Sequence, residues 1–251
     1  GTLTLNKMTL TNYWNGKPSQ YDATAESINI KDHFASEEYQ KLYALSSCVN
    51  SSALLRPEVK GSSTEVAILN LIEKMGYNYE DMREQYPAIV KFPFNSKRKR
   101  MSILITENDK EVLLLKGASE IVLAACDKWI CAQTGEVKEI DSKTKEEMEH
   151  AIVGMAEQSL RTLCFAYKIK GAEEDITTAD EKGVYEIEKS GFTLVTIIGV
   201  KDIARPEVPK AIQNCKRAGI KVRMVTGDNI ITARAIAKEV GIIEEGQDAI
   251  V

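Results

Sequence analysis

Hydrophobic residues at helical spacing predict six main helices along the chain. Their ranges are 36–49, 62–76, 118–125, 142–158, 206–218 and 229–240. In the second of them Ser62 precedes Glu65 by three residues, the spacing of a capping box that begins a helix. Gly219 and Gly241 follow the last two helices, as expected of residues that end a helix. A shorter helical segment is expected over 181–189, within an acidic stretch that otherwise indicates a loop.

Short apolar or alternating runs between these helices predict strands. Their ranges are 89–94, 100–106, 112–115, 162–167, 192–200 and 222–225. The polar residues 107–110 separate the second run from the third and indicate a hairpin turn, so an antiparallel sheet is expected in the middle of the chain. The first 35 residues show a mixed pattern with one turn signal, around Gly16.

After Asp202 the pattern changes to a helix, the apolar strand 222–225 and a second helix. This order is typical of parallel α/β sheets. We therefore predict an α+β domain, an antiparallel sheet flanked by helices, inserted in an α/β domain of which the chain holds an incomplete part.

Composition favours a soluble globular protein. The 251 residues correspond to about 1.7 domains of ordinary size. With 43% hydrophobic and 28% charged residues, the chain is neither disordered nor collagen-like. A formal net charge of −4 argues against a protein that binds nucleic acid through phosphate contacts. The longest strongly apolar stretch, 194–200, is far shorter than the roughly 18 residues of a membrane helix.

The cysteines and histidines indicate neither a metal site nor a disulfide framework. The five cysteines are odd in number, and the closest pair, Cys126 and Cys131, encloses four residues. His33 and His150 are the two histidines. No zinc site is therefore expected, and the cysteines are interpreted as reduced thiols of a cytosolic protein.

Thr226, Gly227 and Asp228 lie where a predicted strand ends and a helix begins. Open α/β sheets bind ligands at this edge, and a hydroxyl, a glycine N–H and a helix N-terminus together suit a phosphate. On shape alone a purely structural interpretation is favoured, in which Asp228 or Asn229 caps the helix and Gly227 supplies the turn.

Lys116 and Gly117 form a second junction, between a predicted strand and a helix. A lysine beside a glycine that allows close backbone approach could hold an anion. Junctions of this kind are common, however, and Glu120 in the first helical turn would suit the helix dipole equally well.

The segment 91–102 combines aromatic and basic residues. Phe92 and Phe94 precede four consecutive basic residues, 97–100. An aromatic ring can stack on a nucleotide base and a lysine can bind its phosphates. A core phenylalanine followed by a solvated turn would give the same pattern.

Six short motifs follow one another along the chain. They are Gly61-Ser-Ser-Thr64-Glu65, Phe94-Asn-Ser-Lys-Arg-Lys99-Arg-Met-Ser, Lys116-Gly-Ala, Ser159-Leu-Arg161-Thr-Leu, Asp202 to Arg205-Pro-Glu-Val208, and Met224-Val-Thr226-Gly-Asp228. In this order they resemble the cytosolic headpiece of P-type ion-motive ATPases. The opening Gly1-Thr2-Leu3-Thr4 is similar to the end of that family's phosphorylation motif, Asp-Lys-Thr-Gly-Thr-Leu-Thr. The resemblance spans nearly the whole chain.

Within the family, the stretches 205–212, 217–229, 232–237 and 94–102 are most similar to the calmodulin-regulated, plasma-membrane type of calcium pump. Sodium–potassium and proton pumps share much of the C-terminal part, so a nucleotide-binding domain of one of these pumps is the alternative.

The resemblance implies a nucleotide-binding domain over 7–201 and a partial phosphorylation domain over 1–6 and 202–251, the latter with a haloacid-dehalogenase-like, Rossmann-like α/β fold. The implied ATP-binding residues are Thr64, Glu65, Phe94, Lys99, Lys116, Gly117, Arg161, Thr226, Gly227 and Asp228. Phe94 would stack on adenine and Arg161 would reach the phosphates, while Asp202 and Arg205 resemble the hinge between the domains.

The same resemblance implies that the chemistry lies outside the chain. The acceptor aspartate would precede Gly1, where the chain looks cut, so neither a catalytic residue nor a metal ligand is expected here. We expect a part of a Ca²⁺-transporting ATPase that binds ATP without hydrolysing it, the complete pump using Mg²⁺. Its partners would be ATP and the phosphorylation, actuator and transmembrane domains, on the cytoplasmic face of a membrane. Calmodulin would act outside this chain.

Two other classes of function are weighed against this one. A free-standing soluble phosphatase of the haloacid-dehalogenase type would show Mg²⁺-dependent phosphatase activity. An interaction module without a ligand would use the basic residues 97–100 to dock an acidic partner.

Overall fold

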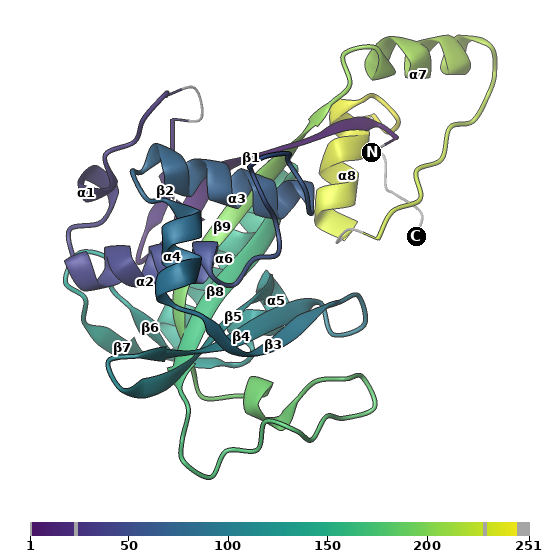
Figure 1. Cartoon of the computed structure of the whole chain (residues 1–251). Helices are drawn as coiled ribbons and strands as arrows, with labels where there is room; N and C mark the ends of the chain where they lie inside the picture. The colour runs from purple at the N-terminus through teal and green to yellow at the C-terminus, as the bar shows by residue number, and fades with distance from the viewer. Residues whose placement is uncertain (1, 23–24, 228–229, 245–251) are drawn as a thin grey trace.

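An antiparallel sheet organises most of the chain in the computed structural model, which describes residues 2–22, 25–227 and 230–244 (Figure 1). The strands are β1 (Thr4–Trp14), β2 (Pro18–Gln20), β3 (Ala88–Asn95), β4 (Arg100–Glu107), β5 (Lys110–Ala118), β6 (Cys126–Ile130), β7 (Val137–Glu139), β8 (Leu160–Ile169) and β9 (Phe192–Ala204). Their order across the sheet is β2-β1-β9-β8-β5-β4-β3, and β6 joins it by pairing with β7 and, in parallel, with β9.

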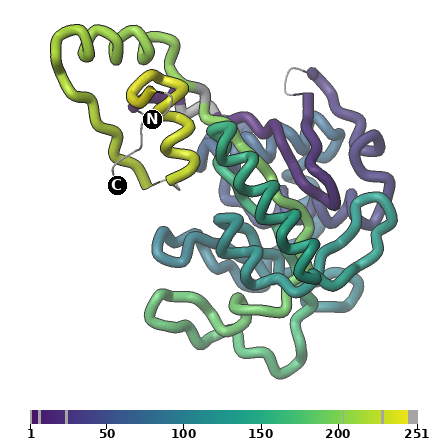
Figure 2. The backbone as a smooth tube through the Cα atoms, turned by 180° about the vertical axis from the view of Figure 1, so that it is seen from behind, coloured from purple at the N-terminus to yellow at the C-terminus, as the bar shows by residue number. Residues whose placement is uncertain are grey.

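Helices cover both faces of this sheet. The helices of the described residues are α1 (Ile30–His33), α2 (Glu37–Cys48), α3 (Ser63–Lys74), α4 (Tyr79–Gln85), α5 (Ser119–Leu123), α6 (Ser142–Glu157), α7 (Val208–Arg217) and α8 (Ile230–Glu239). A 3₁₀ turn, η1, spans Glu186–Glu188. Helices α1 to α4 lie on the face towards the viewer in Figure 1, and the long α6 crosses the opposite face, seen from behind in Figure 2.

The alternation of side chains along the central strands explains why both faces are covered. In β4, Ile103 and Ile105 join the core beneath α2 and α3, whereas Leu104 between them joins the core beneath α6. Successive side chains of a strand point to opposite faces, so an apolar run without polar interruptions needs a cover on each side. The predicted antiparallel sheet flanked by helices is confirmed.

The predicted helix starts are confirmed at three sites by capping hydrogen bonds. Ser36, Ser62 and Asp141 each accept, through the side chain, the backbone N–H of the residue three positions later. Such bonds satisfy donors at a helix N-terminus that have no partner within the helix.

Strand β1 is absent from the sequence-based assignment. It pairs with β9, but the register shifts twice along it, between Thr4 and Met8 and between Leu10 and Asn12. Each irregularity interrupts the period of two by which a half-buried strand is recognised in a sequence. Strand β1 therefore looks irregular in the sequence although most of its residues pair in the sheet.

The predicted strand 222–225 is wrong. This stretch is extended chain between α7 and α8 without strand pairing, and the side chain of Val225 is 98% exposed. A strand needs a neighbour that accepts hydrogen bonds from its N–H groups and donates to its C=O groups, and no described strand pairs with this stretch. The expected helix over 181–189 is reduced to the short turn η1.

Helices α7 and α8 are held to the end of β9 by a small apolar cluster of their own. Val208, Ile212 and Val240 form its buried centre, and Leu3 and Ala204 pack against it from the strand ends. This part lies beyond the end of the sheet in Figure 1.

A bulge in β9 gives a test of the packing. Phe165 pairs with Thr196 and Ala166 with Leu194, which leaves Val195 as an extra residue whose carbonyl accepts the Tyr39 hydroxyl at 2.8 Å. Tyr39→Phe should lower the free energy of unfolding by about 1–3 kcal/mol, because a buried carbonyl loses its hydrogen-bond donor. Urea denaturation measures this.

Tyr77→Phe makes the same chemical change on the connection between α3 and α4 and should shift stability by less than about 0.5 kcal/mol. Equal effects of the two substitutions would contradict a special role for the Tyr39 hydroxyl.

Candidate functional site

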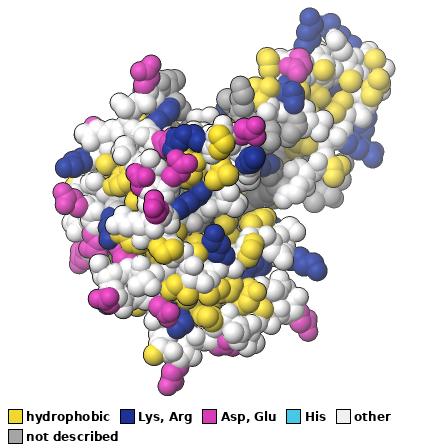
Figure 3. Space-filling view, in the orientation of Figure 1, with side chains coloured by type: hydrophobic (Ala, Val, Ile, Leu, Met, Phe, Trp, Pro, Cys, Tyr) yellow, Lys and Arg dark blue, Asp and Glu magenta, His cyan; other side chains and the backbone are white. Residues whose placement is uncertain are grey.

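A pocket of about 680 Å³ opens where the ends of β3, β5 and β8 meet the N-terminus of α3. Eight of the ten residues predicted to bind ATP line it: Thr64, Glu65, Phe94, Lys99, Lys116, Gly117, Arg161 and Gly227. Figure 3 shows basic and apolar side chains side by side where this face of the molecule is hollowed. Charged and apolar groups thus meet in one concave site, the general character of ligand pockets.

The register of the sheet brings together residues that are far apart in the sequence. Arg100 on β4 pairs with Gly117 on β5, and Gly117 in turn pairs with Cys164 on β8. The turn 96–99, the end of β5 and the beginning of β8 are therefore neighbours at one edge of the pocket. Three of the six sequence motifs meet through this pairing alone.

Gly117 allows the β3–β4 turn to approach β5 closely. A Cβ atom on this residue would lie 2.5 Å from the carbonyl oxygen of Lys99. That oxygen accepts the N–H of Ala118 at 3.0 Å, while the N–H of Lys99 donates to Asn95 O at 2.7 Å. Any larger residue at 117 would push the turn away from the sheet.

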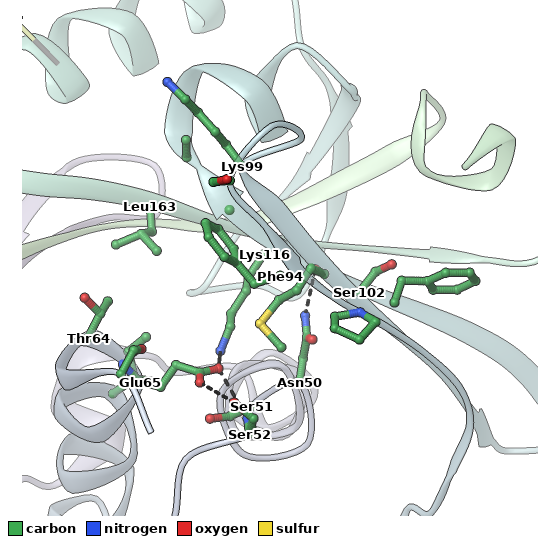
Figure 4. Close-up of a pocket in the computed structure, with 18 of the residues that line it drawn as sticks. Asn50, Ser51, Ser52, Thr64, Glu65, Phe94, Lys99, Ser102, Lys116 and Leu163 are labelled. Carbon is green, nitrogen blue, oxygen red and sulfur yellow. Dashed lines mark hydrogen bonds and ion pairs between the residues drawn. The ribbon is translucent and has the colours of Figure 1, made fainter. Parts of the chain in front are cut away.

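Lys99 is held in an unfavourable backbone conformation. Its φ of 49° lies in the left-handed region, which costs a residue with a side chain about 1–2 kcal/mol. Such a conformation persists when the surroundings determine it, and it is frequent at functional sites. In this conformation the exposed Lys99 side chain is carried at the rim of the pocket (Figure 4).

The floor of the pocket contains an ion pair between Lys116 and Glu65, with Nζ and Oε1 2.7 Å apart. Both side chains are buried, 4% and 10% exposed. The other carboxylate oxygen of Glu65 accepts the hydroxyl of Ser52 at 2.8 Å, as Figure 4 shows. The predicted capping box is thus only half formed: Ser62 caps α3, but the Glu65 carboxylate turns to Lys116 and Ser52.

Burial and pairing act against each other on this ion pair. Burial tends to raise the pKa of Glu65, but the charge of Lys116 and the hydrogen bonds from Lys116 and Ser52 prevail and leave this pKa below its ordinary value of 4.5. For Lys116 burial prevails over the attraction of Glu65 and lowers its pKa from 10.5. At neutral pH we take Glu65 as ionised and paired with the Lys116 ammonium.

Phe94 is an exposed aromatic residue in the middle of the site. It sits at the end of β3 with 61% of its surface accessible, and Figure 4 shows its ring among the side chains that line the pocket. The neighbouring Phe92, by contrast, is 3% exposed and belongs to the core. The sequence left both roles open for this aromatic pair, and the structure divides them between the two rings.

The C-terminal part contributes less to the pocket than the motifs predict. Gly227 lines it and Thr226 is not among the lining residues, while Asp228 lies outside the described residues. Thr232 on α8 also lines the pocket, and its hydroxyl donates to Leu160 O at 3.2 Å. This bond ties α8 to the beginning of β8, next to Arg161.

Several pocket residues were missed by sequence analysis. Asn50 lies just after α2, and its amide donates to Leu114 O at 3.2 Å; Ser51 and Ser52 follow it in the lining. The only signal is a polar run after a helix, which is equally typical of any loop. The basic run 97–100 was interpreted as a solvated turn or as a ligand contact, but the side chain of Arg98 is buried.

The remaining thiols and carboxylates do not form a second reactive centre. All five cysteines are free, and burial raises the pKa of Cys48 to about 12. Within the described ranges, no three His, Cys, Asp or Glu side chains gather as a metal site would require. None of the helices in those ranges combines the length and the apolar character needed to cross a membrane.

Comparison with known proteins identifies the class to which this fold and pocket belong. The family model for the P-type ATPase cytoplasmic domain N matches residues 38–207, the range that contains most of the sheet and the pocket. The chain belongs to the P-type ATPase family.

Its relatives include plasma-membrane calcium pumps. The chain is 35% identical to calcium-transporting ATPase 12, plasma membrane-type, of Arabidopsis thaliana, over 100% of this chain and 24% of the relative. It is 37% identical to human plasma membrane calcium-transporting ATPase 1, over 99% of this chain and 21% of the relative. With calcium-transporting ATPase 2, plasma membrane-type, of Arabidopsis thaliana it shares 44% identity, over 78% of this chain and 19% of the relative. The chain thus spans about a quarter of their length or less.

The Glu65–Lys116 pair predicts a specific acid sensitivity. Because the pKa of Glu65 is lowered in the folded protein, its contribution to stability is present above its ordinary value of 4.5 and is lost as the pH falls through the folded value. Once the pH has fallen through the lowered pKa of Glu65, protonation of this carboxylate leaves the Lys116 ammonium buried and unpaired, which is strongly unfavourable.

The measurement is the midpoint of thermal unfolding between pH 7 and pH 3 for the wild type and for the double variant Glu65→Gln, Lys116→Met. The wild-type midpoint should fall more steeply, since all other carboxyl groups titrate in both proteins. Parallel curves would show that the pair does not respond to acid.

Proposed function

We propose that the chain binds ATP in this pocket, with the adenine stacked on Phe94 and the phosphates directed towards Lys99 and Arg161. The observation that carries the proposal is an exposed aromatic ring in a concave site whose rim bears cations. An exposed ring loses apolar contact with water when a base covers it, and such stacking contributes about 1–3 kcal/mol per base.

The arrangement of charges supports an anionic ligand with one apolar end. Lys99 is at the rim and Arg161 is half-buried at the start of β8, whereas the charge of Lys116 is balanced by Glu65. The rim therefore carries basic side chains, and the charges on the floor balance each other. A nucleotide, with a neutral base and charged phosphates, matches this division.

The side of the pocket where the charges are paired supports the same orientation. Thr64 and Glu65 from α3, Ser52 and the Lys116 chain lie on this side. Their hydroxyl and carboxylate oxygens are suited to accept hydrogen bonds from the adenine amino group or the ribose hydroxyls. One stacked base and a few exposed cations correspond to a Kd of about 0.1–1 mM.

For the whole protein we propose a P-type Ca²⁺-transporting ATPase in which this part presents the γ-phosphate to an acceptor aspartate elsewhere in the pump. The relatives are named calcium-transporting ATPases, which favours calcium over sodium–potassium or proton transport. We further propose that 7–201 is the nucleotide-binding domain, on the cytoplasmic side of the membrane. The stretches 1–6 and 202–251 would belong to a haloacid-dehalogenase-like phosphorylation domain, in which Thr226, Gly227 and Asp228 handle phosphate.

For the complete pump we propose Mg²⁺ as the metal ion that accompanies ATP. The described residues of this chain do not gather the His, Cys, Asp or Glu side chains of a metal site. Calmodulin, and the actuator and transmembrane domains, would act on other parts of the pump.

Phe94→Ala should weaken ATP binding by about 5- to 150-fold while the fold stays intact, because it removes the stacking surface and leaves the core unchanged. A ¹H–¹⁵N NMR titration with ATP measures Kd and locates the shifts, which should map near Phe94 and Lys116. Ile89→Ala is the matched control: Ile89 is a second exposed apolar residue of β3, 48% exposed, outside the pocket. Equal Kd values for wild type and Phe94→Ala would contradict the proposal.

A phosphatase assay separates the proposal from a soluble phosphatase. Since the acceptor aspartate is assigned to another part of the pump, this chain with Mg²⁺ and p-nitrophenyl phosphate should show no turnover above buffer. Turnover that follows the protein through purification would favour the phosphatase alternative.

A further inference from the structure

The segment 170–191 between β8 and β9, here called the strap, is attached to the β3–β4 hairpin through one buried carboxylate. Glu188, in the short turn η1, is 0% exposed. Its Oε2 pairs with Nη1 of Arg98, and its Oε1 accepts the hydroxyl of Ser102 at 2.6 Å. Its backbone oxygen accepts a hydrogen bond from Nη1 of Arg100 at 2.8 Å. The carboxylate therefore contacts both the turn and β4.

Arg98 also connects Glu188 to β3. Its Nη2 donates to the carbonyl oxygens of Phe92 at 2.8 Å and of Pro93 at 2.6 Å. The Tyr185 ring of the strap covers the group, with the guanidinium carbon 5.6 Å from its centroid. The guanidinium thus joins the turn to the residues that directly precede Phe94.

Two of the residues proposed to contact ATP are immediate neighbours of this network. Phe94 follows Pro93, and Lys99 follows Arg98. Neither Arg98 nor Glu188 is among the residues that line the pocket, so neither is placed to touch the nucleotide. The network can affect binding through the hairpin residues that it holds, among them Ser102, which lines the pocket.

The turn is held from two sides. On the side of β5, the carbonyl of Lys99 accepts the N–H of Ala118 where Gly117 leaves room. On the side of the strap, Arg98 is fixed by Glu188. Lys99 lies between these two attachments in its left-handed conformation. An unfavourable backbone conformation of this kind persists only when the surrounding contacts hold it in place.

We infer that Glu188 is a positioning residue for nucleotide binding: from the strap, its carboxylate orients Arg98 and through it the hairpin that carries Phe94 and Lys99. The inference rests on the proposed ATP function. Glu188 contributes placement of the aromatic ring and the lysine before the ligand arrives, and such preorganisation raises affinity by reducing the ordering required on binding.

The test substitutes Glu188→Gln and measures ATP affinity and hairpin mobility in the same protein. The Kd for ATP should rise about fivefold or more, the usual lower range of a coupling between residues that do not share the ligand. Hydrogen exchange at the Lys99 amide, which donates to Asn95 O, should become faster, while exchange at Leu114 in the middle of β5 stays unchanged. Glu186→Gln is the matched control, because Glu186 lies in the same turn and pairs with the exposed Lys189.

A second variant separates positioning from stability. Removing one member of a buried ion pair can unfold a protein, whereas replacing both charges is often tolerated. The double variant Arg98→Met, Glu188→Gln keeps an acceptor for Ser102 but loses the bonds to Phe92 O and Pro93 O. If Glu188 serves only stability, a folded double variant will bind ATP like the wild type, and that result would overturn the inference. A rise in Kd together with faster exchange at Lys99 supports it.

The outcomes also distinguish this inference from the proposed function. If the wild type and Phe94→Ala both fail to bind ATP, the proposed function fails and the inference with it. If Phe94→Ala weakens binding but neither Glu188→Gln nor the double variant does, the proposed function stands and the inference alone is wrong.

Discussion

The close approach of the β3–β4 turn to Gly117 is the contact on which the site depends. Because position 117 has no Cβ, the Lys99 carbonyl can accept the Ala118 N–H, and the strands keep the register that pairs Arg100 with Gly117. The same register turns the Lys116 side chain towards Glu65, since neighbouring residues of a strand face opposite sides. One missing side chain thus allows both the rim and the floor of the pocket to form.

Two buried ion pairs hold this arrangement from different sides. Lys116–Glu65 joins β5 to α3, and Arg98–Glu188 joins the hairpin turn to the strap. Replacing a buried pair with apolar residues is often neutral for stability, so the main consequence of these pairs is geometric. A charged group away from water must satisfy its hydrogen bonds, and few arrangements do so. We regard the two pairs as the reason that an exposed ring and an exposed lysine can share a stable site.

The elements that could be predicted from sequence are those with uninterrupted patterns. The strands around the pocket and the helices from Ser36 and Ser62 agree with the prediction to within a few residues, because their hydrophobic periods are regular and their caps are local. Strand β1 was missed because its bulges break the period. The apolar stretch 222–225 was misassigned for the opposite reason: its pattern is that of a buried strand, but pairing requires a neighbour that a local pattern cannot supply.

By itself the sequence determined the family, most elements and eight of the residues that meet in the pocket, because motif order and hydrophobic period are properties of the chain alone. The local residue pattern could not decide which of the rings of Phe92 and Phe94 is exposed, although the family resemblance indicated Phe94, or which member of the run 97–100 is buried. Phe92 and Phe94 differ in their surroundings, and Arg98 differs from Lys99 by the presence of Glu188, 90 residues away along the chain. Only the tertiary structure decides which of these side chains is buried and which is exposed. Burial and charge pairing depend on segments that are far apart in the sequence and that the register of the sheet and the packing of the strap bring together.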